Sequence, residues 1–245
     1  MIAENVVSPH HRAARKPLFL ASSFAAFAHL CALCGQKLLT LFYDRGGMSS
    51  DPITAFILAD GKSTRMGTDK AFLELAGRPL ISHALELARA VSEEIKIVGD
   101  PKTFASFGAV IPDIYPARGP LAGIHAALAN TATDYNLILG VDLPFLQPHF
   151  LNYLITEARS SSAVVSVPSA DGHLHPLCAV YRKQFGPITQ AALEKGKNKI
   201  DSLFAGIVIR IIDEAELATN GFTPIQFRNL NTPEDWQQAN RDFPA

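Results

Sequence analysis

A loop of small and charged residues follows the apolar run Ile53–Leu58, and its residue types suit phosphate binding. Gly61 and Gly67 permit sharp turns that bring backbone N–H groups close to phosphate oxygens. Arg65 and Lys70 add positive charge that backbone dipoles alone do not supply. The glycine spacing is neither that of a P-loop nor that of the Gly-x-Gly-x-x-Gly dinucleotide fingerprint. We therefore predict that Arg65 and Lys70 contact phosphate, with ordinary solvated surface cations as the alternative.

Asp142 is a candidate metal ligand. It follows the apolar run 137–141 and precedes Leu-Pro. Mg²⁺ prefers oxygen ligands and usually keeps several waters while it bridges to a substrate phosphate. A carboxylate at the end of a buried strand is well placed for that role. The competing interpretation is an aspartate that caps a helix or a turn.

The elements that position these residues follow from the pattern of apolar residues. Runs rich in β-branched residues predict short buried strands at 53–58, 95–98, 109–111, 137–141, 163–167 and 207–212. Apolar positions at helical spacing predict helices at 80–91, 121–130, 148–158 and 185–195. Strand and helix in alternation favour an α/β fold with a mainly parallel sheet and helices on both faces.

The candidate residues all come directly after predicted strands. The loop 58–70 follows the first strand, Asp100 the second, Asp113 the third and Asp142 the fourth. Ligands of open α/β sheets bind beyond the carboxyl ends of the strands. We therefore expect these residues to lie at one edge of the sheet.

Two later segments refine the expected topology. Residues 163–167 and 177–181, joined through 170–173, have the pattern of a β-hairpin, which makes the sheet mixed rather than purely parallel. Thr232 followed by Pro233 is typical of a helix start, with threonine as the N-cap and proline at the first helical position. We therefore expect a closing helix near the C-terminus.

The charge distribution limits the partners of this 245-residue chain. Its formal net charge is −1, but residues 1–47 carry five basic and two acidic side chains, which leaves −4 on residues 48–245. A mildly acidic domain lacks the basic surface of sequence-independent nucleic-acid binding. We expect a small phosphate-bearing ligand and no nucleic acid.

The N-terminal 47 residues differ in composition from the rest. A basic stretch at 10–16 precedes the mostly apolar stretch 18–34, which is typical of a targeting peptide or, less often, a membrane anchor. The anomaly ends at Met48, so we interpret 1–47 as a non-native or disordered extension and 48–245 as the catalytic domain. The alternatives are a true targeting segment and a membrane-tethered protein. Cys178 is the sole cysteine of 48–245, which fits a reducing compartment, and we expect a cytoplasmic protein without membrane contact.

Residues 58–70, Leu-Ala-Asp-Gly-Lys-Ser-Thr-Arg-Met-Gly-Thr-Asp-Lys, resemble the L-A-G-G-x-S-x-R-M-G-x-D-K signature of nucleotidyltransferases that build the dinucleotide form of the molybdenum cofactor. Further matches in the family's order are GPLAGI at 119–124, VDLPFLQP at 141–148, HPLCAVY at 175–181 and NLNTPEDW at 229–236. The first motif indicates the wider, Rossmann-like nucleotidyltransferase fold. The last one narrows the resemblance to the molybdenum cofactor guanylyltransferases.

The resemblance also implies roles for individual residues. Asp142 would bind Mg²⁺, and this match favours the metal over a capping role. The nucleotide would contact Leu58, Ala59, Asp60, Gly61, Lys70, Asp113, Gly119 and Asp142. Asn229 and Asn231 would face the pterin, because an amide offers both a donor and an acceptor; local turn stabilisation before the helix is the alternative. A plain loop aspartate is the alternative for Asp113.

Asp60 departs from the family pattern, which usually has glycine at this position. An aspartate can accept hydrogen bonds from N1–H and the exocyclic amine of guanine, so we hypothesise that Asp60 contributes to base selection. Its charge would instead repel the triphosphate if the side chain points the other way.

The reaction implied by the resemblance joins GMP from GTP to molybdenum-bound molybdopterin and releases pyrophosphate. The attacking terminal phosphate is already an anion, so Arg65, Lys70 and Asp142 would act by positioning and charge neutralisation. The alternatives are a cytidylyltransferase for molybdopterin, another nucleotidyltransferase with a sugar-phosphate acceptor, and a nucleotide-binding regulator without turnover. Transient contact with molybdoenzymes or their chaperones is a further expectation.

Overall fold

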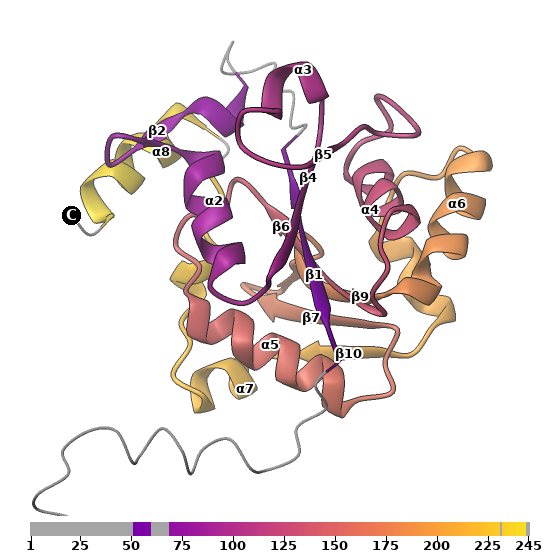
Figure 1. The fold of residues 1–245 in the computed structure, drawn as a ribbon. Coiled ribbons are helices and arrows are strands. Elements are labelled where there is room, and N and C mark those ends of the chain that lie inside the picture. Colours follow the sequence, from indigo (N-terminus) through magenta and orange to yellow (C-terminus); the bar gives the residue numbers. More distant parts are fainter. Residues whose placement is uncertain (1–50, 60–68, 231, 244–245) are drawn as a thin grey trace, which may run out of the picture. The chain divides into compact units, whose positions relative to one another are not determined.

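The computed structural model describes residues 51–59, 69–230 and 232–243. Its described part contains one mixed sheet with a central path of seven strands (Figure 1). Their spatial order is β10 (Ile209–Ile212), β7 (Val165–Ala170), β9 (Cys178–Arg182), β6 (Tyr135–Gly140), β1 (Ile53–Leu58), β4 (Glu94–Val98) and β5 (Val110–Ile111). The expectation for residues 1–47 lies outside the described residues and stays a prediction.

Strand β1 lies in the interior of the sheet, with a strand on each side. It pairs in parallel with β6 on one side and with β4 on the other, and β4 pairs in parallel with β5. Strand β9 is antiparallel to both of its neighbours, β6 and β7. The predicted mixed, mainly parallel α/β sheet is therefore confirmed.

Helices cover both faces of this sheet, as the alternating pattern predicts. One face carries α2 (Leu80–Arg89) and α5 (Pro148–Ser160), and the other carries α4 (Pro120–Ala129) and α6 (Gly186–Glu194) (Figure 1). Successive side chains of a strand point to opposite faces. Ile57 accordingly joins the core under α2 and α5, while Phe56 joins the core under α4 and α6. Burial on both sides explains why β1 is apolar except for Thr54.

A tight turn links β7 to β8 (His173–Leu174), and β7 also pairs with β9. The turn residues Asp171 and Gly172 have φ of 52° and 71°, as the hairpin turns with two positive φ values require. The structure thus confirms the predicted pairing of the 163–167 region with the 177–181 region. It adds β8 as a short extra strand between them in the chain.

Several short elements escaped the sequence pattern because too few residues define a period. They are β2 (Glu74–Leu75), β3 (Arg78–Pro79), α3 (Pro101–Phe104), α7 (Glu214–Thr219) and the 3-10 helices η1 (Lys70–Phe72), η2 (Lys183–Phe185), η3 (Asp201–Gly206) and η4 (Pro224–Phe227). Of these, η1 and η4 matter for the site. Helix η1 begins at the last residue of the 58–70 motif, and η4 ends shortly before the 229–236 motif.

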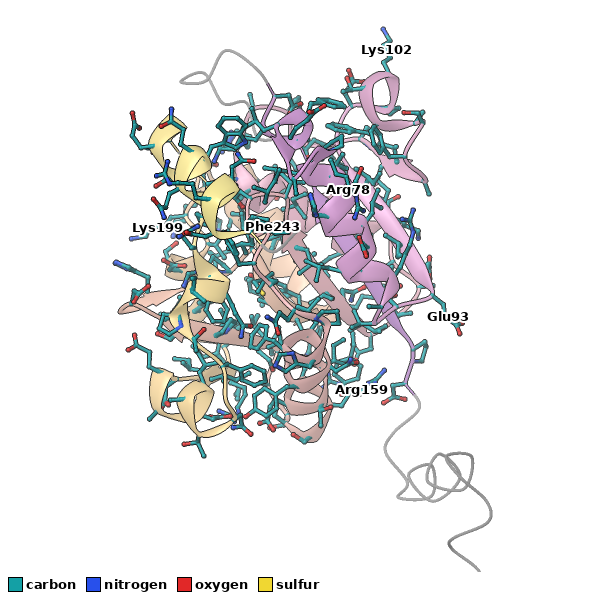
Figure 2. The ribbon with its side chains drawn as sticks, turned by 90° about the vertical axis from the view of Figure 1, so that its left-hand side faces the viewer. Arg78, Glu93, Lys102, Arg159, Lys199 and Phe243 are labelled. Carbon is teal, nitrogen blue, oxygen red and sulfur yellow. The ribbon has the colours of Figure 1, made fainter. Side chains whose placement is uncertain are left out.

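The closing helix α8 (Pro233–Asp242) starts as predicted. The Thr232 hydroxyl accepts from the Asp235 N–H at 3.1 Å, and the Asp235 carboxylate accepts from the Thr232 N–H at 2.9 Å, which completes a capping box. The Trp236 indole N–H donates to the Glu74 carbonyl at 2.9 Å. Phe243, labelled in Figure 2, follows α8. Its ring centroid lies 5.1 Å from that of His83 in α2. The helix therefore packs onto the β2–β3 hairpin and α2.

Throughout the described ranges, helices are too short or too polar to span a bilayer.

Candidate active site

Lys70 and Asp142 meet at the carboxyl edge of the sheet. The Lys70 Nζ lies 3.5 Å from Asp142 Oδ2, and the two side chains are 15% and 20% exposed. The pair forms because β1 and β6 are parallel neighbours with Leu58 opposite Gly140, so the segments after both strands leave from the same edge. Two residues 72 positions apart, each singled out from sequence, are thus in contact.

Gly140 sets the position of the Asp142 side chain. A Cβ at residue 140 would lie 2.8 Å from Asp142 Oδ1 and 3.4 Å from Leu177 Cβ. The Gly140 N–H also donates to the Leu177 carbonyl at 2.7 Å. Glycine therefore allows the carboxylate to fold back over the end of β6.

Lys70 begins η1, and Asp69 caps it. The Asp69 Oδ1 accepts from the Ala71 N–H at 3.0 Å, and the Ala71 side chain is buried. Asp69 therefore acts as the N-cap of this short helix. The cap and the buried alanine fix the direction in which Lys70 leaves the backbone.

The predicted nucleotide side of the edge is tightly packed. The Ala59 N–H donates to the Val98 carbonyl at 3.0 Å. A Cβ on Gly123 would lie 3.0 Å from Leu58 Cδ2, so glycine lets α4 approach β1. Gly119 caps the N-terminus of α4 with φ of 72°, a conformation that favours glycine. The helix N-terminus that follows is a favourable location for an anion.

The two aspartates after β4 and β5 differ in role. Asp100 caps α3, because its Oδ1 accepts from the Lys102 N–H at 3.0 Å. Asp113 lies two residues beyond β5 with a half-buried side chain. Asp100 therefore has a structural task, whereas Asp113 stays a predicted nucleotide contact.

The C-terminal motif reaches the same edge. The Leu230 N–H donates to the backbone carbonyl of Asp142 at 3.1 Å, which brings the half-buried Asn229 next to the end of β6. The His175 ring lies tilted against that of Phe227, with ring centroids 4.8 Å apart. Burial lowers the pKa of His175, while the charge of Asp142 acts in the opposite direction. The resemblance implied a pterin contact for Asn229, but no sequence pattern indicated the Leu230 contact with Asp142.

Asp60, Gly61, Arg65 and Asn231 lie outside the described residues. Their roles in nucleotide, phosphate and pterin binding stay predictions.

The side chains at this edge suit a metal ion that takes some of its ligands from the protein and the others from a substrate. Within the described ranges, His, Cys, Asp and Glu side chains form no group of three that could enclose an ion. Mg²⁺ is usually bound through one or two carboxylates together with substrate phosphates and waters. Asp142, partly exposed at the sheet edge, fits that mode of binding.

The mixed α/β sheet with helices on both faces is the fold of solved nucleotidyltransferases, and Lys70 contacts Asp142 beyond its parallel strands, where ligands of such sheets bind. The chain belongs to the MobA-like NTP transferase domain family, whose match spans residues 55–208. It is therefore a nucleotidyltransferase. Enzymes of this class typically use a divalent metal ion.

Curated relatives match over most of their length. A probable molybdenum cofactor guanylyltransferase of Flavobacterium johnsoniae is 30% identical over 78% of this chain and 97% of that protein. One of Carboxydothermus hydrogenoformans is 32% identical over 78% of this chain and 96% of that protein.

Solved structures agree with this membership. Molybdopterin-guanine dinucleotide biosynthesis protein A of Archaeoglobus fulgidus is 26% identical, with a TM-score of 0.69 over 77% of this chain and 97% of that one. The CMP:2-keto-3-deoxy-manno-octonic acid synthetase complexed with CTP shares the fold, with a TM-score of 0.61 over 78% of this chain and 97% of that one at 15% identity.

Proposed function

We propose that this chain transfers GMP from GTP to molybdenum-bound molybdopterin, forming the guanine dinucleotide cofactor and releasing pyrophosphate. The observation that carries the proposal is the contact of Lys70 with Asp142 at the carboxyl edge of a family-typical sheet. The names of the relatives supply the acceptor and the base.

The chemistry needs positioning more than activation. An oxygen of the terminal phosphate of molybdopterin forms a bond to the α-phosphorus of GTP, and the bond from that phosphorus to the bridging oxygen breaks. Pyrophosphate leaves with the electron pair. Because the attacking phosphate is an anion at neutral pH, no serine, cysteine or histidine has to be deprotonated.

Lys70 supports charge neutralisation in this scheme. Its ammonium lies at the edge where the phosphates would bind, and preorganised positive charge stabilises charge that develops on the leaving pyrophosphate. Arg65, from the predicted phosphate loop, would add a second cation.

Asp142 is the residue that would hold Mg²⁺. When bound, the ion would polarise the α-phosphate as a Lewis acid. The protein's own contribution is to hold this carboxylate in place through Gly140 and through the Leu230 contact to its backbone.

Substrate recognition is divided between the two sides of this edge in our proposal. Leu58, Ala59, Gly61, Asp113 and Gly119 would line the nucleotide. Asn229 and Asn231 would contact the pterin, and the Leu230 hydrogen bond to Asp142 supports that placement for the Asn229 segment.

Asp60 would read the guanine base. Replacing it with glycine, the residue usual in the family, should then change the preference between GTP and CTP. Unchanged affinity and preference in Asp60→Gly would remove this role.

The cellular setting is part of the proposal. GTP is a cytoplasmic substrate, so we place the enzyme in the cytoplasm. We expect it to hand its product to molybdoenzymes or their chaperones through transient contacts.

The test is pyrophosphate release by the full chain with Mg²⁺ and molybdopterin, comparing GTP, CTP, ATP and UTP. GTP-selective release that disappears in Asp142→Ala but persists in the matched variant Asp134→Ala would support the proposal. Asp134 is a suitable control because it also pairs with a cation, Arg182, at the opposite edge of the sheet. Selectivity for CTP would indicate a cytidylyltransferase. Nucleotide binding without release would indicate a regulator.

A further inference from the structure

Arg228 stands one residue before Asn229 and contacts the turn that carries Asp142. Its guanidinium carbon lies 4.4 Å from the ring centroid of Phe145, three residues beyond Asp142. Its Nη1 donates to Asp242 Oδ2 of α8 at 2.8 Å. Arg228 therefore joins the C-terminal helix to the turn after β6.

The described residues offer no hydrogen-bond partner to the rest of this guanidinium. Within the described part of the chain, Nε and Nη2 of Arg228 are buried and have no hydrogen-bond partner. These two nitrogens form one edge of the guanidinium, whose parallel N–H groups match two oxygens of a phosphate or a carboxylate. Buried donors are nearly always paired in folded proteins, and an unpaired one calls for an explanation.

Arg182 shows what the same side chain does in a purely structural setting. It also lies over an aromatic ring, that of Tyr135 at 5.4 Å, and beside a carboxylate, that of Asp134. There, however, Nε and Nη2 both bond Asp134 Oδ2, at 2.8 and 2.6 Å. Arg182 thus binds a protein carboxylate with Nε and Nη2. In Arg228 the same two nitrogens have no partner among the described residues.

A third unsatisfied atom lies two residues earlier in the sequence. Gln226, buried at the end of η4, has a side-chain oxygen without a hydrogen-bond partner in the residues that the structure covers. Residues 226–228 thus combine unused donors with an unused acceptor. The same segment continues through Asn229 to the Leu230 contact with Asp142.

We propose that Arg228 is a binding residue for the terminal phosphate of the acceptor, taking two phosphate oxygens on its Nε and Nη2 edge. The proposal rests on the proposed function, because that function defines the acceptor as a phosphate monoester. Arg228 comes from the C-terminal segment rather than from the loop after β1, so it serves the acceptor and not the triphosphate of GTP.

The side chain must move to bind. The unused edge is covered by protein in this structure, so the guanidinium has to turn away from Phe145 to meet a ligand. The missing hydrogen bonds lower the cost of that movement, because two buried donors gain partners when the phosphate binds. The flexible stem of arginine supplies the required reach.

The experiment measures binding of molybdopterin alone, by its pterin fluorescence, to the full chain and to three variants. Arg228→Met keeps the packing of the stem, and Arg228→Lys keeps the charge but loses the paired N–H groups. Arg182→Met is the matched control. We expect both Arg228 variants to weaken molybdopterin binding about tenfold or more, as for loss of a charge-assisted bidentate contact. GTP affinity should stay within about twofold, and Arg182→Met should bind molybdopterin like the wild type.

Asp242→Asn separates ligand binding from a structural role. It removes the charge that Arg228 pairs with, so a structural role predicts the same loss of molybdopterin binding as Arg228→Met. A binding role predicts unchanged or tighter binding, because the guanidinium is easier to release. Wild-type affinity in Arg228→Met, or equal losses in Arg228→Met and Asp242→Asn, would overturn the proposal.

The proposed function can fail separately. The wild type could bind molybdopterin through Arg228 and yet release no pyrophosphate with GTP. That result would contradict the proposed GMP transfer and support the contact of Arg228 with the acceptor phosphate. If the wild type does not bind molybdopterin at all, both ideas fall.

Discussion

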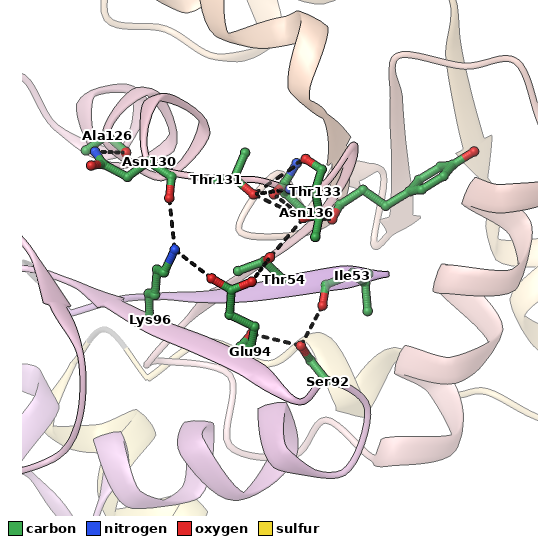
Figure 3. Close-up of polar contacts among 11 residues, drawn as sticks. Ile53, Thr54, Ser92, Glu94, Lys96, Ala126, Asn130, Thr131, Thr133 and Asn136 are labelled. Carbon is green, nitrogen blue, oxygen red and sulfur yellow. Dashed lines mark hydrogen bonds and ion pairs between the residues drawn. The ribbon is translucent and has the colours of Figure 1, made fainter. Parts of the chain in front are cut away.

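The two edges of the central sheet use similar polar residues in opposite ways. At the amino ends of β1, β4 and β6, buried hydroxyl and amide groups bond one another across the strands (Figure 3). At the carboxyl ends, Lys70 and Asp142 lie in contact but partly open to solvent, and Arg228 keeps two donors unused. Thr54, Thr133 and Asn136 bond one another at the amino edge, whereas Arg228 at the carboxyl edge has two buried donors without a partner among the described residues.

The amino edge is a closed network. The Thr54 hydroxyl lies 2.8 Å from that of Thr133 and donates to Glu94 at 3.1 Å. The Asn136 amide donates to the Asp134 carbonyl at 3.0 Å and to the Tyr181 carbonyl at 3.3 Å, which links β6 to β9. Such satisfied networks stabilise a particular strand arrangement.

The largest effect should come from the lysine of the carboxyl edge. Lys70→Met should lower kcat by about 10²–10³-fold, the usual loss on removing one preorganised group that stabilises transition-state charge. Lys96→Met is the matched control, because Lys96 also pairs with a carboxylate, Glu94 at 2.7 Å, but at the amino edge. Steady-state pyrophosphate release measures both variants. Equal losses in the two would contradict the division between the edges.

A smaller loss of activity should follow from displacing the carboxylate. The Cβ of Gly140→Ala would lie 2.8 Å from Asp142 Oδ1, so the carboxylate has to shift. We expect kcat to fall by about 10-fold to 100-fold, since misplacement by about 1 Å has costs of this order. Gly206→Ala is the control, because nothing lies within 4 Å of a Cβ there. Full activity of Gly140→Ala would show that this glycine does not position Asp142.

Thr133→Val should affect stability instead of activity. The Thr133 hydroxyl contacts the hydroxyl of Thr54 and the side-chain oxygen of Asn136, and removing it leaves buried groups unsatisfied. We expect the free energy of unfolding to fall by about 1–3 kcal/mol, with kcat unchanged. Denaturant unfolding measures the loss. Thr156→Val, whose hydroxyl bonds only the Asn152 carbonyl on α5 in the described hydrogen bonds, should change stability much less.

The predictable part of this molecule is what local patterns encode. Apolar runs of five or six residues and helical spacing predicted β1, β6 and the four main helices, because burial on one or both faces determines those patterns. Parallel pairing then determined that Lys70 and Asp142 would share an edge.

The remaining features depend on partners distant in the chain. The Trp236 indole bonds the Glu74 carbonyl across 162 residues, and no local pattern encodes such a pair. The two unused donors of Arg228 are visible only once Phe145 and Asp242 are placed around it. The same holds for Gly140, whose need for glycine arises from a folded-back side chain.

The smallest expected effect belongs to the exposed member of the amino edge. The hydrogen bond from Lys96 lowers the pKa of Glu94 below its ordinary value. Burial opposes this shift, and the hydrogen bond from the Thr54 hydroxyl adds to it. A lowered folded-state pKa stabilises the protein above the unfolded pKa, and this stabilisation is lost as the pH falls through the folded value.

Glu94→Gln should therefore cost less than about 1 kcal/mol at neutral pH, because the carboxylate is largely solvated and its ion pair is screened. The difference from the wild type should shrink as the pH is lowered from about 5 to about 3, measured by denaturant unfolding. A difference that grows on acidification would mean that Glu94 is stabilised in its protonated form. The closed network of the amino edge would then include a carboxylic acid donor, and its contrast with the partly solvent-exposed carboxyl edge would be sharper still.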